Sequence, residues 1–168
     1  MIETSIAALT ELHPLWIALV LAAIAFLEAC PGVGLFVSGI LLLTVSTAVY
    51  ANGLLLPTQI MAAAFTGAIL ADHTGYFLGR WLGPRLENSR LFSKRRAQVE
   101  KAEALVARFG VLAVVAGRLI PAVRSVIPTL VGMSGLRLVV FTVADVVACS
   151  IWVLGLTALN QGLNTVLN

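Results

Sequence analysis

The sequence predicts an all-α integral membrane protein, built as an inverted repeat of a re-entrant helical hairpin followed by a transmembrane helix. Of the 168 residues, 60% are hydrophobic and 11% are charged, whereas an average soluble domain has about 25% charged residues. Long apolar segments are interrupted by proline and glycine, once in each half of the chain. In each half a charged residue stands three positions before a proline: Glu28 before Pro31, and Arg118 before Pro121. We expect a single membrane domain over residues 1–168.

The first predicted element is a re-entrant hairpin over residues 14–50. It opens at Pro14, a residue that is tolerated in the first turn of a helix, and the apolar run that follows is short for a membrane span. Glu28 interrupts this run near its end, and Pro31 with its neighbouring glycines then breaks it. A second apolar run follows and completes the hairpin.

A transmembrane helix is predicted next, over residues 57–82, with Asp72 and His73 in its middle. Small residues at four-residue spacing let a neighbouring helix approach closely. Three of them follow Asp72, at Gly75, Gly79 and Gly83. They could pack within one chain or between two chains, so a homodimer stays open.

The basic residues are concentrated in the middle of the chain. All 11 lie between Arg80 and Arg137, and a central loop over residues 80–108 holds most of them. By the positive-inside rule this loop is cytoplasmic. Residues 84–109 have apolar positions at helical spacing, which predicts a basic amphipathic segment on the inner leaflet, or equally a solvated connector helix. Anionic lipid accounts for this charge, so we expect no nucleic-acid partner.

A second re-entrant hairpin is predicted over residues 111–136, and its centre carries Arg118, Pro121, Arg124 and Pro128. An arginine at bilayer depth costs at least ~2.5–3.5 kcal/mol, so it usually has a functional reason. Proline removes a helical hydrogen bond, and unwound backbone survives in lipid only where protein buries it or where it lines a wet cavity. These four residues therefore indicate a binding site for an anion or a lipid headgroup. A short polar loop between two ordinary spans is the alternative.

The last predicted helix covers residues 138–159, contains Asp145 and is followed by a polar tail. With the central loop cytoplasmic, the two halves run in opposite directions and the hairpin tips meet near the midplane. Inverted repeats with discontinuous helices at the midplane are an architecture of transporters. Six short spans, or four spans with a cytoplasmic N-terminus, are the alternatives.

Three segments resemble the DedA family, also called the SNARE-associated or VTT-domain family. Residues 67–83 are similar to the family's helix with the pattern G-x-x-x-x-D-x-x-G-Y-x-x-G-R-x-x-G. Residues 117–124 resemble its F-x-R-F-x-P-x-x-R signature, and Glu28 ahead of Pro31 resembles the acid that precedes its first re-entrant loop. The chain departs from the family at Val33, where many members carry a second acid.

The resemblance implies a multi-pass protein of the bacterial inner (cytoplasmic) membrane that moves lipid across the bilayer as a scramblase or flippase. It also implies two opposed re-entrant loops. The lipids associated with the family are phospholipids and undecaprenyl phosphate, a polyprenyl phosphate carrier.

Lipid translocation is the leading functional hypothesis. Arg118 and Arg124 offer donor forks suited to a headgroup phosphate, and unwinding at Pro121 would let both face one cavity. Backbone N–H groups freed by the prolines would add anion contacts. Glu28 and Asp72 would pair with the arginines when no lipid is bound, or take up protons and couple transport to the proton gradient.

The remaining polar residues leave alternatives open. His73 would extend a proton relay or serve as a structural hydrogen-bonding group, and Asp145 would pair with a neighbouring helix or act in transport. An enzyme acting on lipid phosphates and a purely structural ion-pair network are the other functional classes. We expect no enzymatic activity, no cofactor and no metal, because cofactor fingerprints and metal-ligand spacings do not occur. Cys30 and Cys149 are expected to be small core residues.

Overall fold

The computed structural model is a bundle of helices and connecting turns. It describes residues 13–31, 33–35, 39–86, 104, 108–120 and 124–167. Its elements are α2 (Pro14–Ala29), the 3₁₀ turn η1 (Val33–Leu35), α3 (Gly39–Ala51), α4 (Pro57–Leu86), α7 (Val111–Leu119), α8 (Ile127–Met133) and α9 (Leu138–Leu167).

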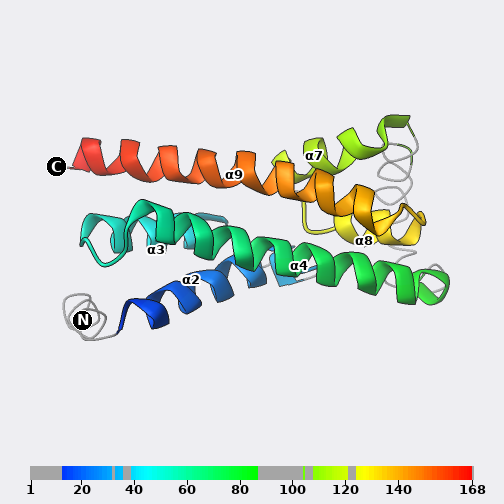
Figure 1. Cartoon of the computed structure of the whole chain (residues 1–168), viewed down its shortest axis with the longest axis horizontal. Helices are drawn as coiled ribbons and strands as arrows, with labels where there is room; N and C mark the ends of the chain where they lie inside the picture. Colours follow the sequence, from blue (N-terminus) through cyan, green and yellow to red (C-terminus); the bar gives the residue numbers. More distant parts are fainter. Residues whose placement is uncertain are drawn as a thin grey trace.

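Two long antiparallel helices, α4 and α9, run the length of the molecule (Figure 1). Each has 30 residues, which is ~45 Å at 1.5 Å per residue. Within α9, the 26 residues from Leu138 to Leu163 have a mean hydropathy of 2.2, so this helix is long and apolar enough to cross a membrane. Among the helices that the structure describes, α9 is the one that meets this test.

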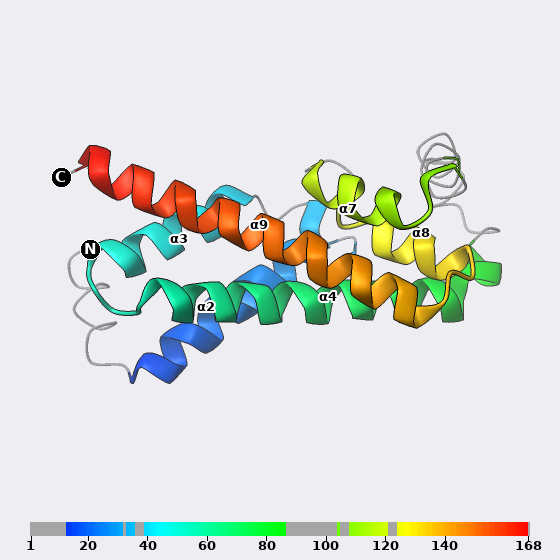
Figure 2. The ribbon, with the colours of Figure 1, turned by 45° about the horizontal axis from the view of Figure 1, so that its top comes forward.

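Shorter helices cover the two ends of the long pair. α2 and α3 lie beside the first half of α4, whereas α7 and α8 lie near its other end (Figures 1 and 2). α2 and α8 both pack mainly on α4, and α7 packs mainly on α9. The chain reverses direction between α2 and α3, and again between α7 and α8, and both reversals lie near the middle of the long helices (Figure 1).

Glycines on α4 allow the close approach of these shorter helices. A Cβ at Gly67 would collide with the carbonyl oxygen of Ala22 on α2, and one at Gly79 with the carbonyl oxygen of Thr129 on α8. A Cβ at Gly75 would lie 2.8 Å from Pro31 Cγ and 3.2 Å from Pro128 Cβ. The prolines of both chain reversals therefore meet α4 at this glycine.

Gly75 and Gly79 thus pack against helices of the same chain. The side chain of Pro128 is buried in the first turn of α8, where its missing N–H costs little. The contact that the structure shows for Pro128 is its packing against Gly75 of α4.

Both long helices extend beyond their predicted ends. α4 continues to Leu86 instead of ending at residue 82, and α9 continues to Leu167 through the predicted polar tail. The reason for the second difference is Asn160, which is buried against α3 and accepts hydrogen bonds from Thr47 Oγ1 at 2.9 Å and Ser46 Oγ at 3.2 Å. A polar residue with buried partners continues a packed helix and does not mark its end.

Two predictions fall largely outside the described residues. Most of the basic segment 84–109 is one of them, and Pro121 is the other. The described residue Gly110 has a φ of 51°, a conformation that favours glycine, and α7 begins directly after it.

Candidate functional site

Arg118 lies at the end of α7 between two carboxylates that come from the two long helices. Its Nη1 forms an ion pair with Asp72 on α4, and the same atom lies 3.4 Å from Oδ1 of Asp145 on α9. The side chain of Arg118 is 8% exposed, and those of the two aspartates are 1% and 2% exposed. One guanidinium therefore contacts two buried acids, and it links α4, α7 and α9 at this point.

Arg124 forms the second ion pair, with Glu28 at the end of α2. Its Nη2 pairs with Glu28 Oε1 and also lies 3.4 Å from the backbone oxygen of Glu28. The carbonyl groups of the last helical turn have no partner within their own helix, so this arginine meets both the acid and the end of α2. The side chain of Arg124 is 16% exposed, twice as much as that of Arg118, and that of Glu28 is 2% exposed.

Both guanidinium groups lie near one aromatic ring. The Cζ of Arg118 is 5.6 Å from the ring centroid of Trp152 on α9, and the Cζ of Arg124 is 5.9 Å from it. Cations within about 6 Å of a tryptophan ring are attracted by its electron-rich face. Trp152 was not predicted as a site residue. A signal exists in the sequence, because it follows Asp145 by two helical turns and therefore shares that residue's face of α9.

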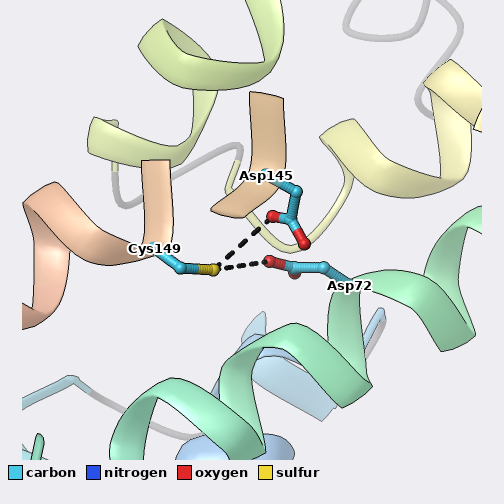
Figure 3. Close-up of side chains that lie close together, drawn as sticks. All are labelled: Asp72, Asp145 and Cys149. Atoms are coloured by element: carbon cyan, nitrogen blue, oxygen red, sulfur yellow. Dashed lines mark hydrogen bonds between the residues drawn. The ribbon is translucent and has the colours of Figure 1, made fainter. Parts of the chain in front are cut away.

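A thiol completes the acidic side of the site. Cys149 Sγ lies 3.6 Å from Asp145 Oδ1 and 4.0 Å from Asp72 Oδ2 (Figure 3). The ligand atoms of these three buried residues lie within 4.8 Å of one another, so they could hold a metal ion. Arg118 Nη1 already contacts both carboxylates, so a metal ion would have to displace the guanidinium. Cys149 is thus a polar neighbour of the site, not only the small core residue that was predicted.

His73 borders the same acids from α4. Its Nδ1 lies 2.9 Å from the carbonyl oxygen of Ile69 and 3.6 Å from Asp145 Oδ2, and its Nε2 lies 3.0 Å from Thr142 Oγ1. A neutral ring donates from Nδ1 to Ile69 and accepts at Nε2 from the threonine hydroxyl. A protonated ring donates at both positions. Because the Ile69 carbonyl can only accept, the contacts favour a ring that carries a hydrogen on Nδ1.

Several buried polar atoms around the two ion pairs have no hydrogen-bond partner within the described part of the chain. They are Glu28 Oε2, Asp72 Oδ1, Arg118 Nε, Thr129 Oγ1 and Asp145 Oδ2. A buried polar atom without a partner costs about 1–3 kcal/mol, and such atoms are few in native proteins. Four of the five atoms belong to residues of the two ion pairs, so these pairs do not fully satisfy the buried polar groups that form them.

The structure therefore brings together the predicted arginines Arg118 and Arg124 with the predicted acids. His73 stands beside them, whereas Pro128 packs away from the charges against α4. Neither of the two arginines faces the solvent freely, because each is engaged by a carboxylate.

Comparison with known proteins gives the family. The chain matches the VTT domain over residues 4–161. It belongs to the VTT-domain (DedA) family, a family of membrane proteins. No solved structure matches the chain significantly.

Its VTT-domain relatives include two from Escherichia coli. Inner membrane protein YabI is 25% identical over 77% of this chain and 51% of its own length, and inner membrane protein YghB is 31% identical over 78% and 60%. An uncharacterized membrane protein of Mycobacterium tuberculosis, Rv0364, is 34% identical over 59% of this chain and 44% of its own length. The chain thus spans about half the length of the curated relatives it matches.

Proposed function

We propose that this protein moves a phosphate-bearing lipid, a phospholipid or a polyprenyl phosphate, across the membrane. The observation that carries the proposal is the meeting of two buried arginine–carboxylate pairs where both short-helix segments reverse direction. A phosphate offers guanidinium groups the same bidentate acceptor geometry as a carboxylate. The headgroup would therefore replace Glu28 on Arg124 and the aspartates on Arg118.

The same arrangement supports the inverted repeat. α2 and α3 with α4 form one half, and α7 and α8 with α9 form the other, with the long helices antiparallel. Glu28 and Arg118 occupy corresponding places, each at or near the end of the first short helix of its half. We infer that the two short-helix pairs are re-entrant hairpins entering from opposite faces, with the basic central segment on the cytoplasmic side.

Charge counting supports a coupled proton. Glu28, Asp72 and Asp145 supply three negative charges, and Arg118 and Arg124 supply two positive ones. With His73 neutral, the group carries one excess negative charge, which is costly in a low-dielectric interior. One added proton on this group would balance it. A phosphate that takes the arginines frees the carboxylates, so its binding would be accompanied by further proton uptake.

Transport of fluorescent phospholipid in liposomes tests this function, with Arg124→Gln as the variant. Arg124 is partly exposed at the edge of the site, so its loss is less disruptive to folding than the loss of Arg118. We expect transport to fall at least about tenfold, since a charge-assisted hydrogen bond contributes about 1.5–3 kcal/mol. The matched control is Arg108→Gln, at an exposed arginine whose Cζ lies 5.4 Å from the ring centroid of Phe109.

Two further measurements separate the alternatives. Release of inorganic phosphate from the lipid would favour the enzyme hypothesis, and a transport rate that responds to an imposed pH gradient would support proton coupling. If Arg124→Gln transports lipid at the wild-type rate in folded protein, the headgroup role of this arginine is refuted.

A further inference from the structure

A second basic site lies away from the two ion pairs, where α8 leads into α9 at the right of Figure 1. There a cavity of about 380 Å³ opens beside the last turns of α4. Its lining residues come from α4, from the turn after α8 and from the start of α9, and they are Tyr76, Phe77, Arg80, Gly135, Arg137, Leu138 and Val139. Arg80 follows Asp72 by eight residues, which is ~12 Å along the helix axis.

The two arginines of this cavity differ from Arg118 and Arg124 in their partners, because Arg118 and Arg124 are each engaged by a carboxylate. Arg80 Nη1 donates a hydrogen bond to Tyr76 Oη at 3.0 Å, and the tyrosine hydroxyl donates to the carbonyl oxygen of Leu136 at 2.6 Å. Across residues 13–31, 33–35, 39–86, 104, 108–120 and 124–167, no carboxylate forms an ion pair with Arg80 or Arg137. Two positive charges therefore border one cavity, and Tyr76 holds the first of them in place.

The beginning of α9 adds to this positive potential. Leu138 and Val139, its first two residues, line the cavity, and the first turn of the helix has no acidic residue. The chain enters α9 through Gly135, whose φ of 76° favours glycine. Because the first N–H groups of a helix lack intrahelical partners, they add to the attraction that the two arginines exert on an anion.

Apolar side chains lie directly beside these charges. Phe77 is 52% exposed and Val139 is 70% exposed, and both line the cavity. A soluble anion gains nothing from such neighbours, whereas a phospholipid has a phosphate and acyl chains that match both. We propose that this cavity binds the phosphate of an anionic phospholipid, with Arg80 and Arg137 as its donors and the first turn of α9 as a further anion contact. The site is separate from the ion pairs and does not require the protein to transport lipid.

Lipid binding to the purified full chain tests the proposal, with phosphatidylglycerol and phosphatidylcholine as probes and native mass spectrometry as the readout. The variant carries Arg80→Gln together with Arg137→Gln, and both positions are exposed, so the fold should be kept. We expect its affinity for phosphatidylglycerol to fall at least about tenfold, because two charge-assisted contacts are lost. The control Arg108→Gln removes one exposed positive charge away from the cavity and should change the affinity less than about twofold.

Three results would overturn the proposal. The double variant could bind phosphatidylglycerol as wild type does, or the Arg108 control could lose as much affinity. Inorganic phosphate could displace the lipid at equal concentration, which would make the site one for a soluble anion. Measurements in an Arg124→Gln background separate this proposal from the proposed function: transport should fall at least about tenfold, while Arg80→Gln with Arg137→Gln should still lower the affinity for phosphatidylglycerol at least about tenfold. If transport survives in Arg124→Gln and the binding results hold, only the proposed function fails.

Discussion

Removal of Arg118 tests how much the central charge arrangement contributes to the fold. Arg118→Gln leaves Asp72 and Asp145 without their guanidinium, although each has an exposed side-chain fraction of at most 2%. Their oxygens lie within 4.8 Å of each other, so two full charges there repel by about 3–4 kcal/mol at an effective dielectric constant of 20. This agrees with the 3–5 kcal/mol that breaking a buried ion pair typically costs. We expect equilibrium unfolding in mixed detergent micelles to show a loss of that size.

A second substitution then separates the structural role of the pair from its role in binding. Asp72→Asn added to Arg118→Gln restores the net charge of the wild-type group, so the free energy of unfolding should recover by at least half. The control combines Asp72→Asn with Arg124→Gln; because these two residues are not partners, this combination should show no such coupling. Lipid transport should stay lost in the first double variant, since the donor for phosphate is missing.

The outcome can refute either part of the reasoning. If Arg118→Gln unfolds as wild type does, the carboxylates do not depend on this guanidinium. If the double variant recovers both stability and transport, Arg118 only locks helices together and the headgroup mechanism is wrong.

Two further variants test the packing that positions these groups. Trp152→Leu should slow lipid transport several-fold, since cation–π attraction contributes ~0.5–2 kcal/mol per cation, and Trp152→Phe should restore most of the rate; equal rates for Leu and Phe would contradict this. Gly79→Ala should lower the free energy of unfolding by about 1–3 kcal/mol through collision with the Thr129 carbonyl, as seen in thermal unfolding. In the control Gly155→Ala the new Cβ meets nothing within 4 Å, so a comparable loss there would argue against the collision.

The sequence identified the charged residues of the site because charge inside an apolar chain is rare. Arg118, Arg124, Glu28 and Asp72 each interrupt an apolar run, and that alone made them candidates. Which acid meets which arginine could not be predicted, because pairing depends on how α2, α4 and α7 cross. The spacing of Glu28 and its following proline indicated a related break in each half, but spacing does not specify a contact.

Residues that look ordinary in an apolar helix were missed for a physical reason. The side chains of Cys149 and Trp152 are compatible both with lipid and with a protein core. Their contacts with Asp145 and Arg118 become visible only once the orientation of α9 in the fold is known. Asn160 was misleading in the opposite way, since a polar residue after an apolar run predicts a helix end. Its buried hydrogen bonds with α3 reverse that expectation, and they arise from tertiary packing.

Under the proposed function, the unequal engagement of the two arginines would set an order for headgroup exchange. Arg118 is held by two carboxylates, Asp72 and Asp145, and is 8% exposed. Arg124 is held by one carboxylate, Glu28, and is 16% exposed. A ligand shifts a conformational equilibrium only by its differential affinity, so an arriving phosphate has less to displace at Arg124. Under the proposed function, exchange would therefore begin at Arg124, where one carboxylate, Glu28, has to be displaced. The Cζ atoms of both arginines lie within 6 Å of the Trp152 ring centroid, so a displacement of Arg124 would remove one of the two cations from this shared ring.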